Sequence, residues 1–162
     1  MAKEEIVFHR IGIIHSPHQE LAGMPIQPPA AEGVKGTVVL DPIYQEGLMD
    51  LEKFSHVILV YYFHQAKSPE MLVRPFLDDT KHGLFATRAP RRPNGIGISV
   101  VKLLAVKGNI LEVENLDILD GTPLLDIKPY VPDFDGGDDV RIGWLEKSRG
   151  EIKKKLSDER FL

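Results

Sequence analysis

The sequence contains no cysteine among its 162 residues. This absence excludes disulfide bonds, thiolate metal ligands and cysteine nucleophiles. Long apolar runs are also lacking, because the longest, residues 57–63, is far shorter than the roughly 20 residues that span a bilayer. The first ten residues mix lysine, glutamate and arginine with few apolar side chains, which is unlike a secretory signal. We therefore expect a cytoplasmic protein with no membrane partner.

Residues that could bind a metal do not cluster in the sequence. His15 and His18 are three positions apart, but Pro17 bends the chain between them and no third ligand recurs nearby. Residues 133–139 are rich in aspartate, yet they lack the spacing of an EF-hand loop. No serine, histidine and aspartate fit a nucleophile elbow, so hydrolase chemistry has no support. We expect an activity without metal.

The composition is that of one globular domain spanning residues 1–162, with 43% hydrophobic and 27% charged residues. Its net charge of −4 alone argues against a nucleic-acid partner, but the distribution is uneven. Residues 80–111 contain no acidic residue and six basic ones, so the rest of the chain carries −10. These six are Lys81, Arg88, Arg91, Arg92, Lys102 and Lys107. One basic face on an acidic molecule fits an RNA partner; a chance cluster is the alternative.

Short apolar segments separated by turn residues predict a mainly β domain. We expect strands at residues 10–15, 35–40, 55–63, 99–106 and 110–116, the last two joined by a three-residue hairpin connection. Four prolines between residues 17 and 29 predict a loop or flap there. We expect one short helix within residues 43–53 and a helical C-terminal extension at residues 141–162, with an amphipathic helix over 144–161.

The most unusual segment is a turn with three arginines within five residues, stiffened by two prolines. Stiff guanidinium forks suit phosphates and carboxylates, because little conformational entropy is lost on binding. Asn94 and Gly95 can adopt positive φ and expose backbone groups to a ligand. The alternative is a surface turn whose arginines pair with local acids. No acid lies nearby in the sequence, which favours ligand binding.

Residues 83–99 read Gly-Leu-Phe-Ala-Thr-Arg-Ala-Pro-Arg-Arg-Pro-Asn-Gly-Ile-Gly-Ile-Ser. This run resembles the signature of the TsaA-like (TrmO, YaeB-like) family. Residues 11–17, 54–64 and 119–130 resemble further motifs of that family in the same order. The chain departs from the family's commonest turn, which has Ser, Phe and Pro where Ala89, Arg91 and Gly95 stand here.

The resemblance implies a small antiparallel β-barrel with minor helices. It also implies a homodimer with S-adenosylmethionine held near the subunit interface. The implied activity is methylation of the exocyclic nitrogen of N(6)-threonylcarbamoyladenosine, next to the anticodon of tRNA. The sequence itself contains no Rossmann fingerprint, because Gly95 and Gly97 lack the third glycine and lead into a strand.

The same resemblance implies the site residues. The cofactor pocket is assigned to Pro25, Ile26, Gln27, His64, Gln65, Arg88, Ile98, Leu119, Asp120, Gly121 and Thr122. Substrate contacts are expected from Arg91, Arg92, Asn94 and Lys128. Asp126 and Tyr130 are the candidates for assisting proton loss from the target nitrogen, in one cleft with Lys128. Two alternatives stay open: a family methyltransferase acting on another nucleic acid or a small molecule, and a non-catalytic nucleotide- or RNA-binding barrel.

Overall fold

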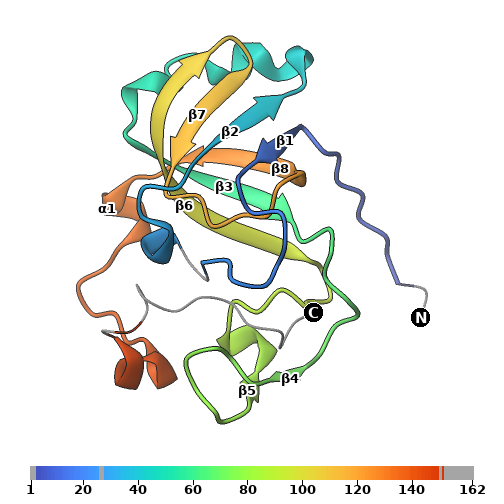
Figure 1. The fold of residues 1–162 in the computed structure, drawn as a ribbon, viewed down its shortest axis with the longest axis vertical. Helices are drawn as coiled ribbons and strands as arrows, with labels where there is room; N and C mark the ends of the chain where they lie inside the picture. Colours follow the sequence, from blue (N-terminus) through green and yellow to red (C-terminus); the bar gives the residue numbers. More distant parts are fainter. Residues whose placement is uncertain (1–2, 26–27, 150, 152–162) are drawn as a thin grey trace.

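A computed structural model describes residues 3–25, 28–149 and 151 of the chain (Figure 1). Six strands form a closed antiparallel barrel in the order β1, β2, β7, β6, β3, β8. They are β1 (Gly12–His15), β2 (Lys35–Leu40), β3 (His56–Tyr62), β6 (Ile96–Lys107), β7 (Ile110–Glu114) and β8 (Thr122–Pro129). The predicted mainly β barrel is confirmed. Within the described ranges, no helix is long and apolar enough to cross a membrane.

The helices are short. They are the 3-10 helices η1 (Pro28–Ala31), η2 (Pro42–Leu48), η3 (Leu51–Lys53), η4 (Leu84–Ala86) and η5 (Gly143–Ser148), and the α-helix α1 (Pro132–Asp135). The helix expected within residues 43–53 is split into η2 and η3, because Asp50 between them has a left-handed φ of 68°. Of the predicted amphipathic C-terminal helix the structure describes η5, while residues 152–162 lie outside the described part.

Alternation along the strands builds the barrel interior. In β3, Val57, Leu59 and Tyr61 point inward and are buried. Leu111 and Val113 of β7 are also fully buried, within the strand predicted at residues 110–116. The glutamates beside them, Glu112 and Glu114, are half-buried rather than free in water, and each pairs with a lysine of β6 (Lys107 and Lys102). These alternating apolar side chains supply most of the hydrophobic core.

The two ends of the barrel carry different connections. At one end, called the loop end, the strands are joined by residues 16–34, 63–95 and 115–121. The other, the hairpin end, holds η2, η3 and the β6–β7 turn (Figure 1). That turn has two residues rather than the expected three, because Lys107 pairs directly with Ile110. Gly108 within it has a φ of 62°, which glycine adopts without strain.

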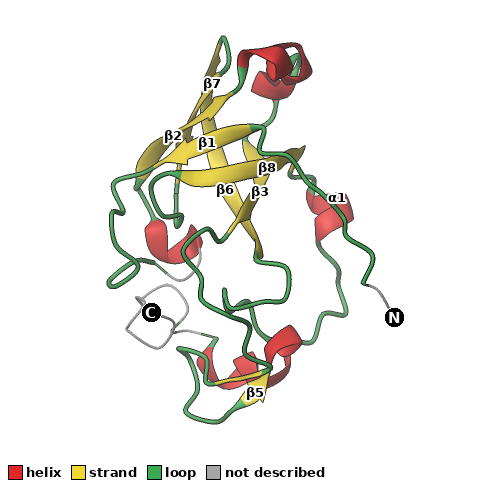
Figure 2. Cartoon of the chain, turned by 90° about the vertical axis from the view of Figure 1, so that its right-hand side faces the viewer, coloured by secondary structure: helices red, strands yellow, loops and turns green. Residues whose placement is uncertain are grey.

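Residues 63–95 form a separate lobe beside the loop end, which was not predicted. The lobe contains η4 and a two-stranded sheet of β4 (Leu72–Val73) and β5 (His82–Gly83). Its own small apolar cluster consists of Val73, Phe76, Leu84 and Ala89. Helix η5 lies against it: the Trp144 Nε1–H donates to the Ala86 carbonyl at 2.8 Å, and the Ser148 hydroxyl donates to the Leu77 carbonyl at 3.0 Å. Figure 2 shows the lobe well apart from the barrel.

Candidate functional site

The predicted cofactor residues other than Ile98, which is in β6, come from connections that meet at the loop end. Pro25 lies in the β1–β2 connection and is buried, whereas Ile26 and Gln27 lie outside the described residues. His64 and Gln65 begin the lobe, and Arg88 lies near its end. Residues 119–122 close the β7–β8 connection. Three segments that are distant in sequence therefore share one end of the barrel.

The turn at Asp120 presents a carboxylate and a glycine. Asp120 Oδ1 accepts the Ser16 N–H at 3.0 Å and lies 3.3 Å from His15 Nδ1. The Ser16 hydrogen bond is the main cause that lowers the pKa of Asp120, so this carboxylate stays ionised. Gly121 has a φ of 78° and no atom within 4 Å of the place where a side chain would begin. A ligand at this turn would meet a fixed negative charge and open backbone.

The neighbours of this turn are anchored inward. Leu119 and Thr122 are buried, and the Thr122 hydroxyl donates to the Leu119 carbonyl at 2.6 Å. The Leu119 carbonyl is thus already engaged within the turn. Of the four predicted residues 119–122, Asp120 and Gly121 are therefore the two that are accessible to solvent.

A buried polar network lies inside the barrel, and the sequence predictions missed it. Ser99 of β6 donates its hydroxyl to Asp117 Oδ1 at 2.6 Å. The Tyr61 hydroxyl lies 2.9 Å from the Ser99 oxygen and donates to it, because the Ser99 proton is used on Asp117. All three side chains are buried. The network spans β3, β6 and the β7–β8 connection, and so ties the loop end together.

Burial dominates the electrostatics of this network. Burial raises the pKa of Asp117 to about 7, although the Ser99 hydrogen bond and the positive charge of Arg88 oppose the rise. Burial likewise raises the pKa of Tyr61, followed by repulsion from Asp117. Near neutral pH the phenol is therefore neutral, and the carboxyl binds its proton far more tightly than an exposed aspartate does. The positive charge of Arg88, a predicted cofactor residue, opposes the rise in pKa of both Tyr61 and Asp117.

Two sequence signals could have located this network. Asp117 stands between Leu116 and Ile118, which are both almost fully buried, and an acid inside an apolar run is unusual. Gly97 leaves the space that the Tyr61 ring fills, because a Cβ there would lie 2.5 Å from Tyr61 Cε2. Asp117 within an apolar run and Gly97 within a strand therefore both pointed to this buried network.

The arginine turn has more internal partners than expected. Arg91 pairs with Glu70 at 3.0 Å and donates to the Ser68 carbonyl at 2.9 Å. The prediction that no acid pairs with it is wrong for Arg91, because the folding of the lobe brings Glu70 from 21 positions away. Arg92 donates to the carbonyls of Thr87 and Ala89 at 3.0 and 3.2 Å.

Asn94 and Gly95 do not adopt the positive φ that their types suggested. Their carbonyls accept hydrogen bonds from the amides of Ile96 and Phe63, both at 2.7 Å. These two hydrogen bonds therefore fix the backbone at the start of β6. The exposed side chain of Asn94 remains the part of this pair that faces solvent.

The remaining predicted residues lie on the outer wall of the barrel. Ile98 points outward with 47% exposure beside Val60, whose other neighbour is Asp126. Lys128 Nζ lies 2.8 Å from Asp126 Oδ2, and this hydrogen bond raises the pKa of Lys128. Asp126 and Lys128, both predicted site residues, are therefore paired with each other on the surface.

Tyr130 follows Lys128 by two positions, just after β8 at the hairpin end. Its N–H donates to the His56 carbonyl at 3.1 Å, and the two rings meet edge to face. Within one chain, Asp126 and Lys128 are therefore bonded to each other, while Tyr130 packs on His56.

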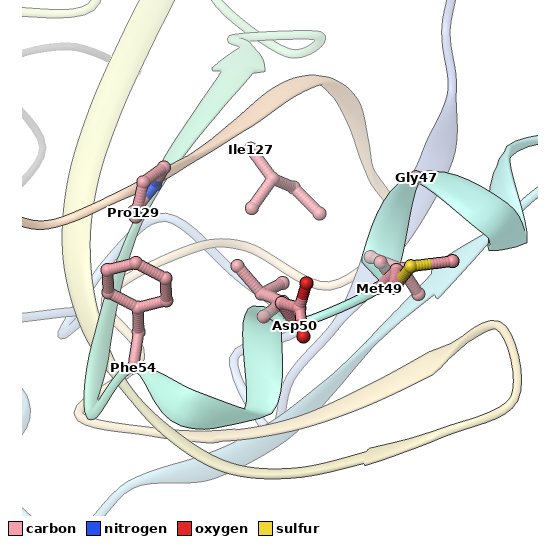
Figure 3. A pocket seen from close by; sticks show the side chains of 8 residues that line it. Gly47, Met49, Asp50, Phe54, Ile127 and Pro129 are labelled. Atoms are coloured by element: carbon pink, nitrogen blue, oxygen red, sulfur yellow. The ribbon is translucent and has the colours of Figure 1, made fainter.

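A cavity of about 230 Å³ lies at the hairpin end (Figure 3). Its wall is mainly apolar and includes Leu48, Met49, Leu51, Phe54, Ile127 and Pro129. None of the predicted site residues lines it. Among the residues that the structure describes, no group of three or more histidine, aspartate or glutamate side chains could hold a metal ion.

A family model described as the tRNA-methyltransferase O N-terminal domain matches residues 13–136. A probable S-adenosyl-L-methionine-binding protein of Pyrococcus abyssi is 58% identical over 156 residues, which cover 96% of this chain and 85% of that protein. Mus musculus tRNA (adenine(37)-N6)-methyltransferase is 35% identical over 141 residues, covering 82% of this chain and 32% of the mouse protein. The crystal structure of TrmO from Pseudomonas aeruginosa matches with a TM-score of 0.74 at 42% identity, covering 87% of this chain and 63% of that one. The chain thus spans most of the archaeal relative and less than two thirds of the other two.

Proposed function

Because the chain belongs to the TrmO family of tRNA methyltransferases, we propose that it transfers a methyl group from S-adenosylmethionine to the exocyclic nitrogen of N(6)-threonylcarbamoyladenosine in tRNA. Relatives named as S-adenosyl-L-methionine-binding proteins support the cofactor. The mouse relative's name supports adenosine 37 as the modified nucleoside. A requirement for the threonylcarbamoyl group is tested by comparing tRNA with and without it.

The residues at the loop end fit this cofactor chemically. S-adenosylmethionine, when bound, supplies a methyl group activated by a positively charged sulfonium. The ionised Asp120 suits ribose hydroxyls or an ammonium group, and the Arg88 guanidinium suits a carboxylate. His64 and Gln65 offer further donors and acceptors at the start of the lobe. Opposite charges on two separate connections match a ligand that carries both signs.

The observation that carries the proposal is this convergence above the buried network. Tyr61, Ser99 and Asp117 link strands to the connection that bears Asp120. Hydrogen bonds that fix a loop in advance reduce the entropy lost when a ligand binds. The chain's contribution to methyl transfer is then mainly alignment of the target nitrogen with the methyl group and exclusion of water.

A homodimer is the second part of the proposal. The outer faces of β3 and β6 expose apolar side chains side by side, because Tyr62 pairs with Ile96 and Ile98 follows on the same face. Exposed apolar patches of this kind mark interaction surfaces. We infer that two copies pack through this face in an isologous dimer, with the two-fold axis perpendicular to the strands so that the barrels run in opposite directions.

This arrangement also gives Asp126 and Tyr130 a role. In one chain Tyr130 lies at the hairpin end, away from Asp120 and Arg88. Strand β8 borders β3, so an antiparallel dimer would bring one copy's Asp126 and Tyr130 toward its partner's loop end. There they would assist the loss of the proton from the carbamoyl-bearing nitrogen.

The test is methyl transfer from S-adenosylmethionine carrying a deuterated methyl group, read by mass spectrometry of nucleosides. We expect the label in tRNA that carries N(6)-threonylcarbamoyladenosine, and no label in matched tRNA that lacks the threonylcarbamoyl group. Label in both would show that the threonylcarbamoyl group is not required and that adenosine 37 itself is the substrate. Cofactor binding by calorimetry without any transfer would identify a binding module instead. Mixed dimers of Arg88→Gln with Tyr130→Phe chains should regain activity if the site is shared between subunits.

A further inference from the structure

Phe85 is a solvent-exposed aromatic residue in a well-anchored part of the backbone. It is 75% exposed, although Leu84 before it is 1% exposed and packs in the lobe cluster. The Ala86 carbonyl after it accepts the hydrogen bond from Trp144. Helix η4, beside β5 in the lower part of Figure 2, is therefore anchored on both sides of Phe85, with the ring on its solvent-facing side. A large apolar ring left outside such a rigid element is a candidate for contact with a partner.

Arg92 lies over this ring. Its guanidinium carbon is 5.7 Å from the Phe85 ring centroid, within the range of a cation–π contact. The same guanidinium is fixed by the carbonyls of Thr87 and Ala89. Ring and cation are thus already ordered, and most of the ring surface is still open to solvent. A partner that stacks on the ring would lose little entropy in ordering it.

The charge around the ring indicates the class of partner. The lobe, residues 63–95, contains six basic and three acidic residues, so it carries +3 while the rest of the chain carries −7. Arg88 lies three positions after Phe85. Exposed aromatic rings on a basic surface are typical of proteins that bind unpaired nucleotides, where bases stack on the rings and cations meet the phosphates.

We propose that Phe85 is a stacking platform for an unpaired base of the RNA substrate. Arg92 supports the ring from one side, and the basic lobe attracts the adjoining phosphates. The proposal rests on the proposed function, because it specifies how the tRNA is held beside the methyl-transfer site. An exposed base is required: a base inside a duplex has no free face to offer.

The test compares phenylalanines that are equally exposed. Phe134 of α1 is 82% exposed and lies outside the lobe, so Phe134→Ala is the matched control. Affinity for an anticodon stem-loop RNA is measured by fluorescence anisotropy at several salt concentrations. Base stacking predicts that Phe85→Ala weakens binding by about 5- to 100-fold. We expect Phe85→Leu to behave like Phe85→Ala, Phe85→Trp to retain binding, and Phe134→Ala to match the wild type.

Three further readouts separate stacking from other roles. The salt slope of the affinity should be the same for Phe85→Ala and wild type, since no phosphate contact is removed. A fully paired RNA duplex without a loop should bind all variants alike. The sedimentation coefficient should not change; a shift in it at unaltered RNA affinity would assign Phe85 to a protein interface and overturn the proposal.

Wild-type RNA affinity in Phe85→Leu would also overturn it, because size and hydrophobicity would then suffice. Failure of the proposed function has a different signature. In that case the wild type would transfer no methyl group, whether or not its RNA affinity depended on Phe85.

Discussion

The loop end and the hairpin end of the barrel are built from the same six strands, yet they differ in what they bury. Five polar side chains are buried in the described part of the chain. Ser16, Ser99, Asp117 and Thr122 are at or near the loop end, and Ser148 is in η5 against the lobe. The hairpin end instead holds an open pocket with a mainly apolar wall. Polar burial is therefore confined to the side where the proposed ligands bind.

This difference shows how stability and binding are divided in the molecule. A buried polar group lowers stability unless it is hydrogen-bonded, and a buried carboxyl does so more strongly. Here Asp117 is bonded to Ser99, and Ser16 is bonded to the Ile118 carbonyl at 2.5 Å. The loop end is thus organised at a cost in stability, whereas apolar packing at the hairpin end supports the frame. Substitutions at the two ends should have different consequences.

The largest expected effect is that of Gly97→Ala at the loop end. Its Cβ would lie 2.5 Å from the Tyr61 ring and 2.7 Å from Phe63, so the ring would have to move and its bond to Ser99 would break. Overpacking of this kind should lower the free energy of unfolding by about 3 kcal/mol. Gly47→Ala in η2 at the hairpin end is the control, because nothing lies within 4 Å of its Cβ. Urea denaturation that gave equal losses would refute the contrast.

Asp117→Asn should have the next largest effect, and it depends on pH. The folded pKa of about 7 lies above the unfolded value of about 3.9. Between these values the unfolded chain ionises while the folded chain keeps its proton, so stability falls as pH rises from about 4 to 7 and stays lower above that. One pKa unit corresponds to about 1.4 kcal/mol, and the loss should reach at least that.

The asparagine variant keeps an acceptor for Ser99 and removes the ionisation. Its stability relative to wild type should therefore increase between pH 4 and pH 8, as followed by thermal unfolding. Asp50→Asn, at an exposed acid of the hairpin end, is the comparison. A pH profile of Asp117→Asn parallel to that of wild type would show that the buried carboxyl does not titrate in this range.

The smallest expected effect is that of Ile127→Val at the hairpin-end cavity. Removal of one methylene group from a partly buried side chain should cost about 0.5–1 kcal/mol of stability. Methyl transfer should be unchanged, since Ile127 lines the cavity and neither Asp126 nor Tyr130 does. Single-turnover rates under conditions where both proteins are fully folded would check this. A slower rate would show that the cavity itself takes part in the reaction.

The frame was predictable from sequence because its signals are local. Residues 35–40 coincide with β2, and the alternation at Leu111 and Val113 matches the observed burial. The lobe was not predictable, because β4 and β5 have two residues each and too short a pattern to recognise. The partner of Arg91 depends on tertiary folding, which brings Glu70 beside it. Asp117 was visible in the sequence only as an acid between aliphatic residues.

The pairing of β1 with β8, Gly12 opposite Leu124, has a consequence for how partners are recognised. It gives every barrel strand a neighbour on both sides, so the barrel has no edge strand with a free row of backbone donors and acceptors. A partner cannot bind the barrel by adding a strand to it, as peptides do on open sheets. Side chains and loop backbone must therefore recognise the cofactor, the RNA or a second copy of the chain. New specificities can therefore arise by side-chain replacement while the hydrogen-bonded frame remains unchanged.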